Sequence, residues 1–201
     1  MITFNTYSTV IKTLEKLFLD KDLKFNFLDF GGENIDVYLN LKKNFKNINY
    51  FVHNESKINS DFIQLKKKYK FENLNIIENL DQINANNYDF ICFGSVIQYI
   101  QNFEKILLIS AQVSKKYIFF SATYFFSESK LTKNDIIVRQ LSFLPSNIYC
   151  YIFNFKKFME IFERNNFSVI FKEKNTKGKV KYNNFDKSYG NIIYADLLLA
   201  R

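Results

Sequence analysis

The chain has 201 residues, of which 47% are hydrophobic and 24% are charged. This composition excludes a disordered chain, and the few Gly (5) and Pro (1) residues exclude collagen-like and Pro-rich architectures. The net charge is +8, but it comes from 25 Lys and only 3 Arg, and Arg is the residue that binds phosphate bidentately. We therefore expect a solvated Lys surface rather than a nucleic-acid partner.

The compartment is indicated by the cysteines, the N-terminus and the apolar runs. Cys92 and Cys150 are the only cysteines, too few for the disulfide framework of a small secreted protein. The first residues have no basic region and no small-residue cleavage site. The longest apolar stretches, residues 117–126 and 192–200, have about half of the ~20 residues that a spanning helix needs. These features predict a cytoplasmic protein without a membrane span.

Hydrophobic periodicity predicts helices and strands in alternation. An amphipathic helix is expected at residues 9–19, within an N-terminal helical cap of residues 1–24. A buried strand at residues 25–30 ends at Gly31-Gly32, and Asn34 is a good N-cap for a helix from Ile35 to Phe45. The pattern continues as strand 48–52, helix 59–69, strand 74–77, short helix 81–85, strand 88–93, helix 103–113 and strand 117–121. Such alternation requires right-handed crossovers and a parallel sheet with helices on both faces.

The alternation ends with the strand at residues 117–121. After Phe125 the pattern changes to an irregular stretch up to Tyr151, which is followed by an expected helix at residues 155–164. Two final strands, at residues 167–171 and 192–199, are joined by a polar connection without a helix, which favours a hairpin. The predicted fold class is α/β, a doubly wound, mostly parallel seven-stranded sheet with a C-terminal antiparallel hairpin. We expect one domain over residues 1–201.

Polar and glycine residues follow the predicted strands, where open α/β sheets bind their ligands. The first strand ends in Asp29-Phe30-Gly31-Gly32, and glycines let the backbone approach a ligand closely. Glu55 follows the second strand, 26 residues after Asp29, and a carboxylate near that position can accept two hydrogen bonds from a ribose diol. Glu78 and Asn79 follow the third strand and could meet an adenine edge. This pattern allows NAD or S-adenosylmethionine.

Two features favour S-adenosylmethionine over NAD. The dinucleotide fingerprint G-x-G-x-x-G is absent, because only Gly31 and Gly32 occur in this loop. An acid at the end of the first strand, Asp29, attracts a cofactor with an amino group and a sulfonium but repels a pyrophosphate. No metal is expected.

The order of these motifs resembles a known family. The segments Leu28-Asp29-Phe30-Gly31-Gly32, Glu55, and Tyr88 to Ile100 look like successive motifs of class I S-adenosylmethionine-dependent methyltransferases. More narrowly, the LDFGG start, the SVIQYI segment, Gln140 and Ile152-Phe153 resemble a bacterial family of methyltransferases associated with surface-polysaccharide (capsule) gene clusters. The resemblance covers about residues 25–171 and implies a Rossmann-like methyltransferase fold.

The resemblance also implies roles for single residues. Asp29, Phe30, Gly31 and Gly32 would border the methionine part of the cofactor. Glu55, with Ser56 beside it, would hold the ribose hydroxyls, and Glu78 and Asn79 would lie near the adenine. Gly94 and Ser95 would offer backbone groups to the amino group, and Gln98 and Tyr99 would face the reaction centre. Many members continue with a further glycine where this chain has Glu33 and Asn34, which places a negative side chain in the cofactor loop.

A hydroxyl acceptor needs a group that removes its proton. His53 is the only histidine, but its place just after the second strand favours a structural role. Asp135, Glu128 and Tyr149 in residues 122–151 are the alternatives, and Tyr149 joins Gln98 and Tyr99 as a candidate catalytic residue.

Three functions remain open from the sequence. The preferred one is O-methylation of a sugar or a sugar-linked group, a small-molecule or glycan-linked acceptor, under a lid of residues 122–151. The second is an RNA methyltransferase or binder, in which Lys and Asn of residues 172–191 follow a phosphate backbone. The third is a non-catalytic partner of the same fold, which Glu33 suggests.

Overall fold

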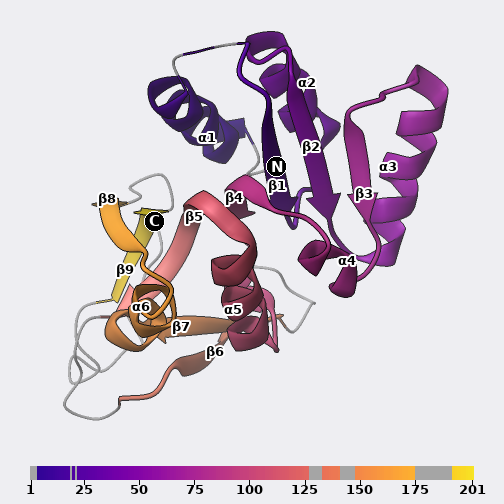
Figure 1. Cartoon of the computed structure of the whole chain (residues 1–201). Helices are drawn as coiled ribbons and strands as arrows, with labels where there is room; N and C mark the ends of the chain where they lie inside the picture. The colour runs from indigo at the N-terminus through magenta and orange to yellow at the C-terminus, as the bar shows by residue number, and fades with distance from the viewer. Residues whose placement is uncertain (1–3, 19, 21, 127–132, 141–147, 175–191) are drawn as a thin grey trace.

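The structure is a computed structural model that describes all residues except 1–3, 19, 21, 127–132, 141–147 and 175–191. Its helices are α1 (Phe4–Leu17), α2 (Ile35–Asn44), α3 (Ser56–Tyr69), α4 (Asp81–Asn84), the 3-10 helix η1 (Ile97–Tyr99), α5 (Phe103–Val113) and α6 (Phe155–Glu163). Its strands are β1 (Phe25–Phe30), β2 (Ile48–His53), β3 (Leu74–Ile77), β4 (Tyr88–Gly94), β5 (Ser114–Phe126), β6 (Ile136–Gln140), β7 (Ile148–Asn154), β8 (Ser168–Lys174) and β9 (Ile192–Ala200). Figure 1 shows their arrangement.

One mixed sheet organises the described residues. Strands β3, β2, β1, β4 and β5 are neighbours in that order and parallel. Strand β9 then pairs antiparallel with β5, and β8 pairs antiparallel with β9. These seven strands confirm the predicted α/β class, the mostly parallel sheet and the C-terminal antiparallel pair.

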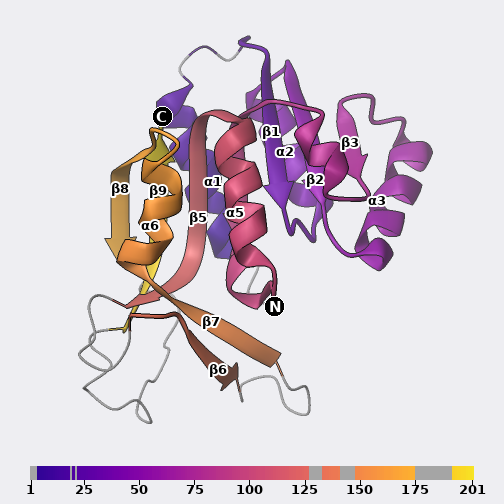
Figure 2. The ribbon, with the colours of Figure 1, turned by 60° about the horizontal axis from the view of Figure 1, so that its bottom comes forward.

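The other two strands correct the prediction for residues 122–151. Strand β5 does not end at residue 121 but continues to Phe126, where its last two residues pair with β7. Strand β7 pairs antiparallel with β6, so the described part of this stretch is a β-hairpin and not irregular. The sheet has nine strands among the described residues instead of seven. Figure 2 shows this hairpin extending below the rest of the sheet.

Helices cover both faces of the sheet, as a doubly wound fold requires. Side chains of α1, α2 and α3 form one buried cluster with one face of the strands, and those of α4, α5 and α6 form a second cluster with the other face. In Figure 2, α5 and α6 lie in front of the sheet and α1 lies behind it. A third, smaller cluster lies between β5 and the hairpin and contains Tyr124, Phe126, Cys150 and Ile152.

Local signals explain several element boundaries. Asn34 caps α2, because its side-chain oxygen accepts a hydrogen bond from the Asp36 backbone N–H. Asn154 caps α6 in the same way, with Lys157 as the donor. The predicted first helix begins earlier, at Phe4, and ends at Leu17.

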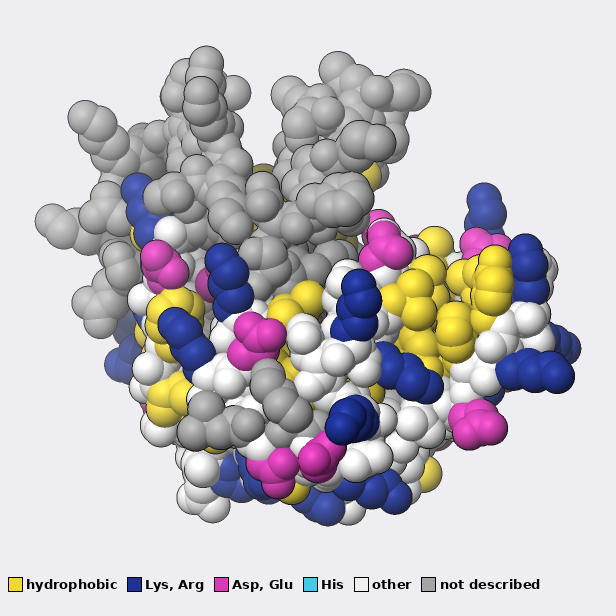
Figure 3. All heavy atoms as spheres, turned by 90° about the horizontal axis from the view of Figure 1, so that it is seen from above, with side chains coloured by type: hydrophobic (Ala, Val, Ile, Leu, Met, Phe, Trp, Pro, Cys, Tyr) yellow, Lys and Arg dark blue, Asp and Glu magenta, His cyan; other side chains and the backbone are white. Residues whose placement is uncertain are grey.

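The surface carries mixed charge on the face seen in Figure 3. Lys and Arg side chains there are spread among Asp, Glu and hydrophobic side chains. No helix in the described ranges is long and apolar enough to cross a membrane.

Candidate functional site

The strand pairing brings the predicted site segments to one edge of the sheet. Phe30 at the end of β1 is in register with His53 on β2 and Phe93 on β4. His53 is in turn in register with Ile77, and Gly94 with Ser121. The loops after β1, β2, β3, β4 and the middle of β5 therefore start side by side, as expected for parallel strands that end at a ligand site.

Asp29 is a buried carboxylate at this edge. Its side chain is 1% exposed, and the Tyr50 hydroxyl donates a hydrogen bond of 2.5 Å to its Oδ2 atom. The other oxygen, Oδ1, is buried and has no hydrogen-bond partner among the described residues. Burial raises the pKa of Asp29 from 3.8 to about 6, and the hydrogen bond from Tyr50 opposes part of that rise. An unsatisfied buried acceptor of this kind is costly to the folded state.

Three glycines shape the backbone around Asp29. Gly31 has φ +80°, and a Cβ atom there would lie 2.6 Å from the Val96 side chain. A Cβ atom on Gly32 would lie 2.5 Å from Oδ2 of Asp29. Gly94 differs, since a Cβ atom there would meet none of the described residues within 4 Å. The first two glycines are required by close packing, whereas Gly94 borders open space.

Two asparagines join the loops after β1, β2 and β3, and the sequence prediction missed both. Asn54 donates a side-chain hydrogen bond of 2.8 Å to the Gly32 carbonyl oxygen. Asn59 is 3% exposed, accepts from the Asn54 backbone N–H (3.1 Å), and donates to the Asn54 (2.9 Å) and Ile77 (3.1 Å) carbonyl oxygens. These bonds hold the loop after β2 against the glycine turn. The only sequence signal was the position of Asn54 directly after the second strand.

Replacing Asn59 by Ala is expected to lower the free energy of unfolding by about 2 kcal/mol. The substitution leaves buried backbone groups without partners, which typically costs about 1–3 kcal/mol. Chemical denaturation measures the change. Ser60→Ala is a suitable control, because the exposed Ser60 hydroxyl bonds only to the Ser56 carbonyl oxygen in the same helix; equal effects of the two substitutions would contradict the prediction.

The loop after β4 is held in an uncommon conformation. Ser95 has φ 60° and Ala122, opposite it in β5, has φ 53°, a region that few non-glycine residues adopt. Gln98 is fully buried, and its side-chain amide donates to the carbonyl oxygens of Ser95 and Ala122, both at 3.2 Å. Strained backbone of this kind concentrates at functional sites.

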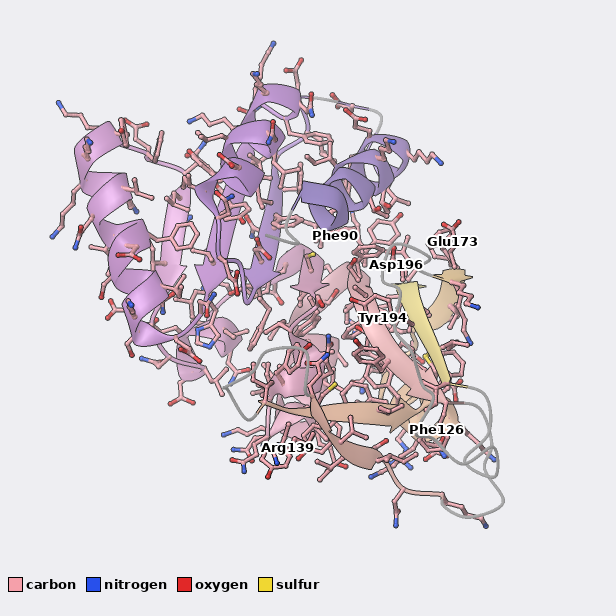
Figure 4. All side chains as sticks on the ribbon, turned by 180° about the vertical axis from the view of Figure 1, so that it is seen from behind. Phe90, Phe126, Arg139, Glu173, Tyr194 and Asp196 are labelled. Carbon is pink, nitrogen blue, oxygen red and sulfur yellow. The ribbon has the colours of Figure 1, made fainter. Side chains whose placement is uncertain are left out.

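Asp196 on β9 fixes the other side of this conformation. Its Oδ1 accepts hydrogen bonds from the Ala122 backbone N–H (2.7 Å) and the Ser121 hydroxyl (3.0 Å). Figure 4 labels Asp196 and Tyr194 on β9, two residues apart, so both project from the same face of that strand. The sequence prediction did not select Asp196, because its role depends on pairing between β5 and β9.

The candidate catalytic residues lie in two places. Gln98 and Tyr99 lie together in η1, and the Tyr99 hydroxyl donates to Oε1 of Gln140 at 3.1 Å. Tyr149 lies opposite Arg139 in the β6–β7 hairpin and is 61% exposed. Because strand residues alternate between faces, Tyr149 is on the opposite face of the hairpin from Gln140. The structure therefore brings Tyr99 to Gln140 but does not bring Tyr149 to them.

The candidate bases also have partners. Asp135 accepts from the Asn154 backbone N–H (2.8 Å) and forms an ion pair of 3.5 Å with Lys157. His53 Nδ1 lies 2.9 Å from the Ile77 carbonyl oxygen, and its ring packs against Phe30. Glu128 lies outside the described residues.

The residues expected near ribose and adenine lie at the ends of β2 and β3. Glu55 is exposed at the N-cap position of α3 without a side-chain capping bond, and Ser56 is the exposed first residue of that helix. Glu78 and Asn79 are exposed, and Oδ1 of Asn79 accepts from the Gln82 backbone N–H. Glu33 is exposed after the glycine turn. Within the described part of the chain, no group of three or more His, Cys, Asp or Glu residues could hold a metal ion.

Comparison of the sequence with protein-family models and with curated proteins finds no match. Solved structures do match. The N-terminal domain of EvdMO1 with S-adenosylhomocysteine bound has a TM-score of 0.67 at 11% identity, covering 98% of this chain and 81% of that one. The 1,6-didemethyltoxoflavin-N1-methyltransferase of Burkholderia thailandensis has a TM-score of 0.63 at 7% identity, covering 99% and 79%. StiE O-MT residues 961–1257 have a TM-score of 0.61 at 11% identity, covering 94% and 73%. The chain thus has the Rossmann-like fold of class I S-adenosylmethionine-dependent methyltransferases.

Proposed function

We propose that the protein is an S-adenosylmethionine-dependent methyltransferase, in which one domain of residues 1–201 binds the cofactor at the carboxyl ends of β1 to β4. The observation that carries the proposal is the buried Oδ1 atom of Asp29, which has no partner among the described residues. It lies beside a glycine turn, at the edge where Gly94 borders open space. The fold alone would not specify the ligand.

The residues at this edge fit the chemistry of S-adenosylmethionine. When bound, that cofactor supplies a methyl group on a sulfonium and a cationic amino group. Asp29 provides a carboxylate for the amino group, and Gly31, Gly94 and Ser95 provide closely approaching backbone. Glu55 and Ser56 would hold the ribose hydroxyls, with Glu78 and Asn79 near the adenine.

Methyl transfer is an in-line displacement, so the protein's main task is alignment of the two reactants. Gln98 supports this task by fixing the backbone of Ser95 and Ala122. Tyr99 directs its hydroxyl toward the hairpin, on the side where an acceptor would approach under a lid of residues 122–151. Tyr149 stays a candidate catalytic residue only for an acceptor that extends to the outer face of the hairpin.

We further propose that the acceptor is a hydroxyl of a sugar or sugar-linked group, such as a surface-polysaccharide precursor. The motif resemblance supports this assignment, together with two structural neighbours. The EvdMO1 domain was crystallised in the presence of S-adenosylhomocysteine and D-fucose, and StiE O-MT is an O-methyltransferase by its name. The RNA alternative relies on residues 172–191, most of which lie outside the described residues.

The experiment that tests the function is isothermal titration calorimetry with S-adenosylmethionine, S-adenosylhomocysteine and NAD. We expect saturable binding of both adenosyl ligands and none of NAD. If neither adenosyl ligand gives a binding heat at millimolar concentration, the proposal is overturned in favour of a non-catalytic partner protein with the same fold. Transfer of label from methyl-labelled S-adenosylmethionine to sugar acceptors then tests the reaction.

A further inference from the structure

The hairpin places a carboxamide beside three tyrosines. Gln140, the last residue of β6, accepts a hydrogen bond from the Tyr99 hydroxyl (3.1 Å) and donates one to the Tyr124 hydroxyl (3.5 Å). The Tyr124 ring packs against the Tyr194 ring with 4.7 Å between centroids. These four residues come from η1, β5, β6 and β9, and we call them the tyrosine–glutamine wall.

The wall adjoins the loop that borders the open space at Gly94. Tyr99 directly follows Gln98, whose amide bonds to the carbonyl oxygen and the hydroxyl of Ser95. Ser95 is the residue after Gly94 and would contact the cofactor. The wall therefore begins next to the residues that are proposed to contact the cofactor.

An ion-pair network anchors the start of β6, the strand that carries Gln140. Lys157 on α6 pairs with Asp135 (3.5 Å) and with Glu104 (3.0 Å) on α5. Asp135 also binds the Asn154 backbone. These contacts join the beginning of β6 to the helices on one face of the sheet, and the pairing of β6 with β7 places Gln140 opposite Ile148.

Within the described ranges, the Gln140 carboxamide has hydrogen-bonding capacity that its contacts do not use, and none of the four wall residues is charged. A carboxamide has two donors and two lone pairs, and the contacts with Tyr99 and Tyr124 use one of each. Tyr99 is 37% exposed, so one end of the wall is accessible. Burial raises the pKa of Tyr99 and of Tyr194, so both stay protonated near neutral pH and act as hydrogen-bonding groups rather than as bases.

We propose that Gln140, acting with Tyr99, is a positioning residue for the methyl acceptor, and that it binds hydroxyl groups of an uncharged, polyhydroxylated ring of the hexose class. This inference rests on the proposed function and deepens it, because it assigns the acceptor side of the same site. The free N–H and lone pair of the carboxamide match a hydroxyl, which both donates and accepts. Gln140 orients such a group but does not remove its proton.

Saturation-transfer NMR on protein loaded with S-adenosylhomocysteine tests the assignment, with D-fucose and D-galactose as the probes. We compare the wild type with Gln140→Ala, Tyr99→Phe and the double variant. Two further variants are compared. Gln140→Glu keeps an acceptor oxygen for the Tyr99 hydroxyl, and Ile137→Ser is the matched control, because Ile137 lies on the exposed, opposite face of the same strand. Thermal unfolding and the affinity for S-adenosylhomocysteine are measured for each protein.

We expect each single loss, Gln140→Ala or Tyr99→Phe, to weaken hexose binding about tenfold, the effect of one or two neutral hydrogen bonds. The double variant should bind the hexose at most about twofold more weakly than either single variant, because the two residues act as a pair. Gln140→Glu should be intermediate and Ile137→Ser unchanged. The affinity for S-adenosylhomocysteine should stay within about twofold of the wild-type value in every variant. A substitution that disturbed the fold in general would lower this affinity as well.

Two results would overturn the inference: no saturation transfer from the loaded wild type to either hexose, or wild-type hexose affinity in Gln140→Ala. If S-adenosylhomocysteine itself fails to bind the wild type, the proposed function fails, and this result is distinct from the other two.

Discussion

Replacement of Asp29 by Asn is expected to weaken binding of S-adenosylhomocysteine at least about a hundredfold and, at the same time, to stabilise the protein at pH 7. The loss of affinity follows because the variant replaces a buried carboxylate by a neutral amide, and hydrogen bonds to a charged group, with the Coulomb attraction, contribute about 3 kcal/mol. The gain in stability follows because the wild-type protein must bury an ionised group whose Oδ1 has no partner among the described residues.

The pH dependence has a defined sign. Burial raises the pKa of Asp29 from 3.8 to about 6, so between these two pH values the folded protein binds more protons than the unfolded chain. The Asp29 contribution to stability is full below pH 4 and is lost as the pH rises through about 6, a difference of up to about 3 kcal/mol. Cofactor affinity changes in the opposite direction and increases as Asp29 ionises between pH 5 and pH 7.

Thermal unfolding between pH 4 and pH 8 and calorimetry between pH 5 and pH 8 check the two parts of this prediction. The stability difference between Asp29→Asn and wild type should grow from pH 4 to about pH 6 and then level off. Asp22→Asn is the matched control, because Asp22 is a highly exposed carboxylate that pairs with Lys46 and such pairs contribute little. A pH-independent stability difference, or unchanged affinity for S-adenosylhomocysteine, would contradict the role of Asp29.

The second large effect is expected for Gly94→Val, which should abolish measurable cofactor binding and leave the melting temperature within a few degrees of wild type. In the part of the chain that the structure describes, a Cβ atom at Gly94 meets nothing within 4 Å, and Val is favoured in strands, so the fold accepts the side chain. The added methyl groups would fill the space that borders Ser95, where the cofactor is proposed to lie.

Gly31→Ala is the contrasting variant. Its Cβ atom would lie 2.6 Å from Val96, at a φ of +80°, and both overlap and left-handed backbone cost free energy, together about 2–4 kcal/mol. Calorimetry and thermal unfolding of the two variants separate a binding position from a packing position. If Gly94→Val is unfolded, or if it still binds the cofactor, the proposal that the cofactor occupies the space beside Gly94 is refuted.

The sequence was sufficient to predict elements that depend on local signals. The bounds of β1, β3 and α5 agree with the prediction, because each is an apolar segment bounded by polar or turn residues. The acids and glycines after the strands were also found, since parallel topology determines where strand ends meet.

Features that depend on contacts between distant segments were missed. Ser121-Ala122 resembles the end of a strand, yet β5 continues because Asp196, 74 residues away, binds the Ala122 backbone. Tyr50 and Asn59 are inconspicuous in the sequence, and only packing brings their polar atoms to Asp29 and to the loop after β2. The β6–β7 pairing was likewise missed, because local periodicity does not specify which segments pair.

The separate small hydrophobic cluster beneath the β6–β7 hairpin has an evolutionary consequence. Tyr124, Phe126, Cys150 and Ile152 pack with one another rather than within either of the two larger clusters. Strand β7 nevertheless contributes Phe153 to the larger cluster that contains Leu28 and Phe30, so only the packing of the small cluster is separate from the strand that supplies Asp29. Substitutions within the small cluster can therefore accumulate and change the shape of the hairpin, while the strand ends that carry Asp29 and the glycines keep their packing.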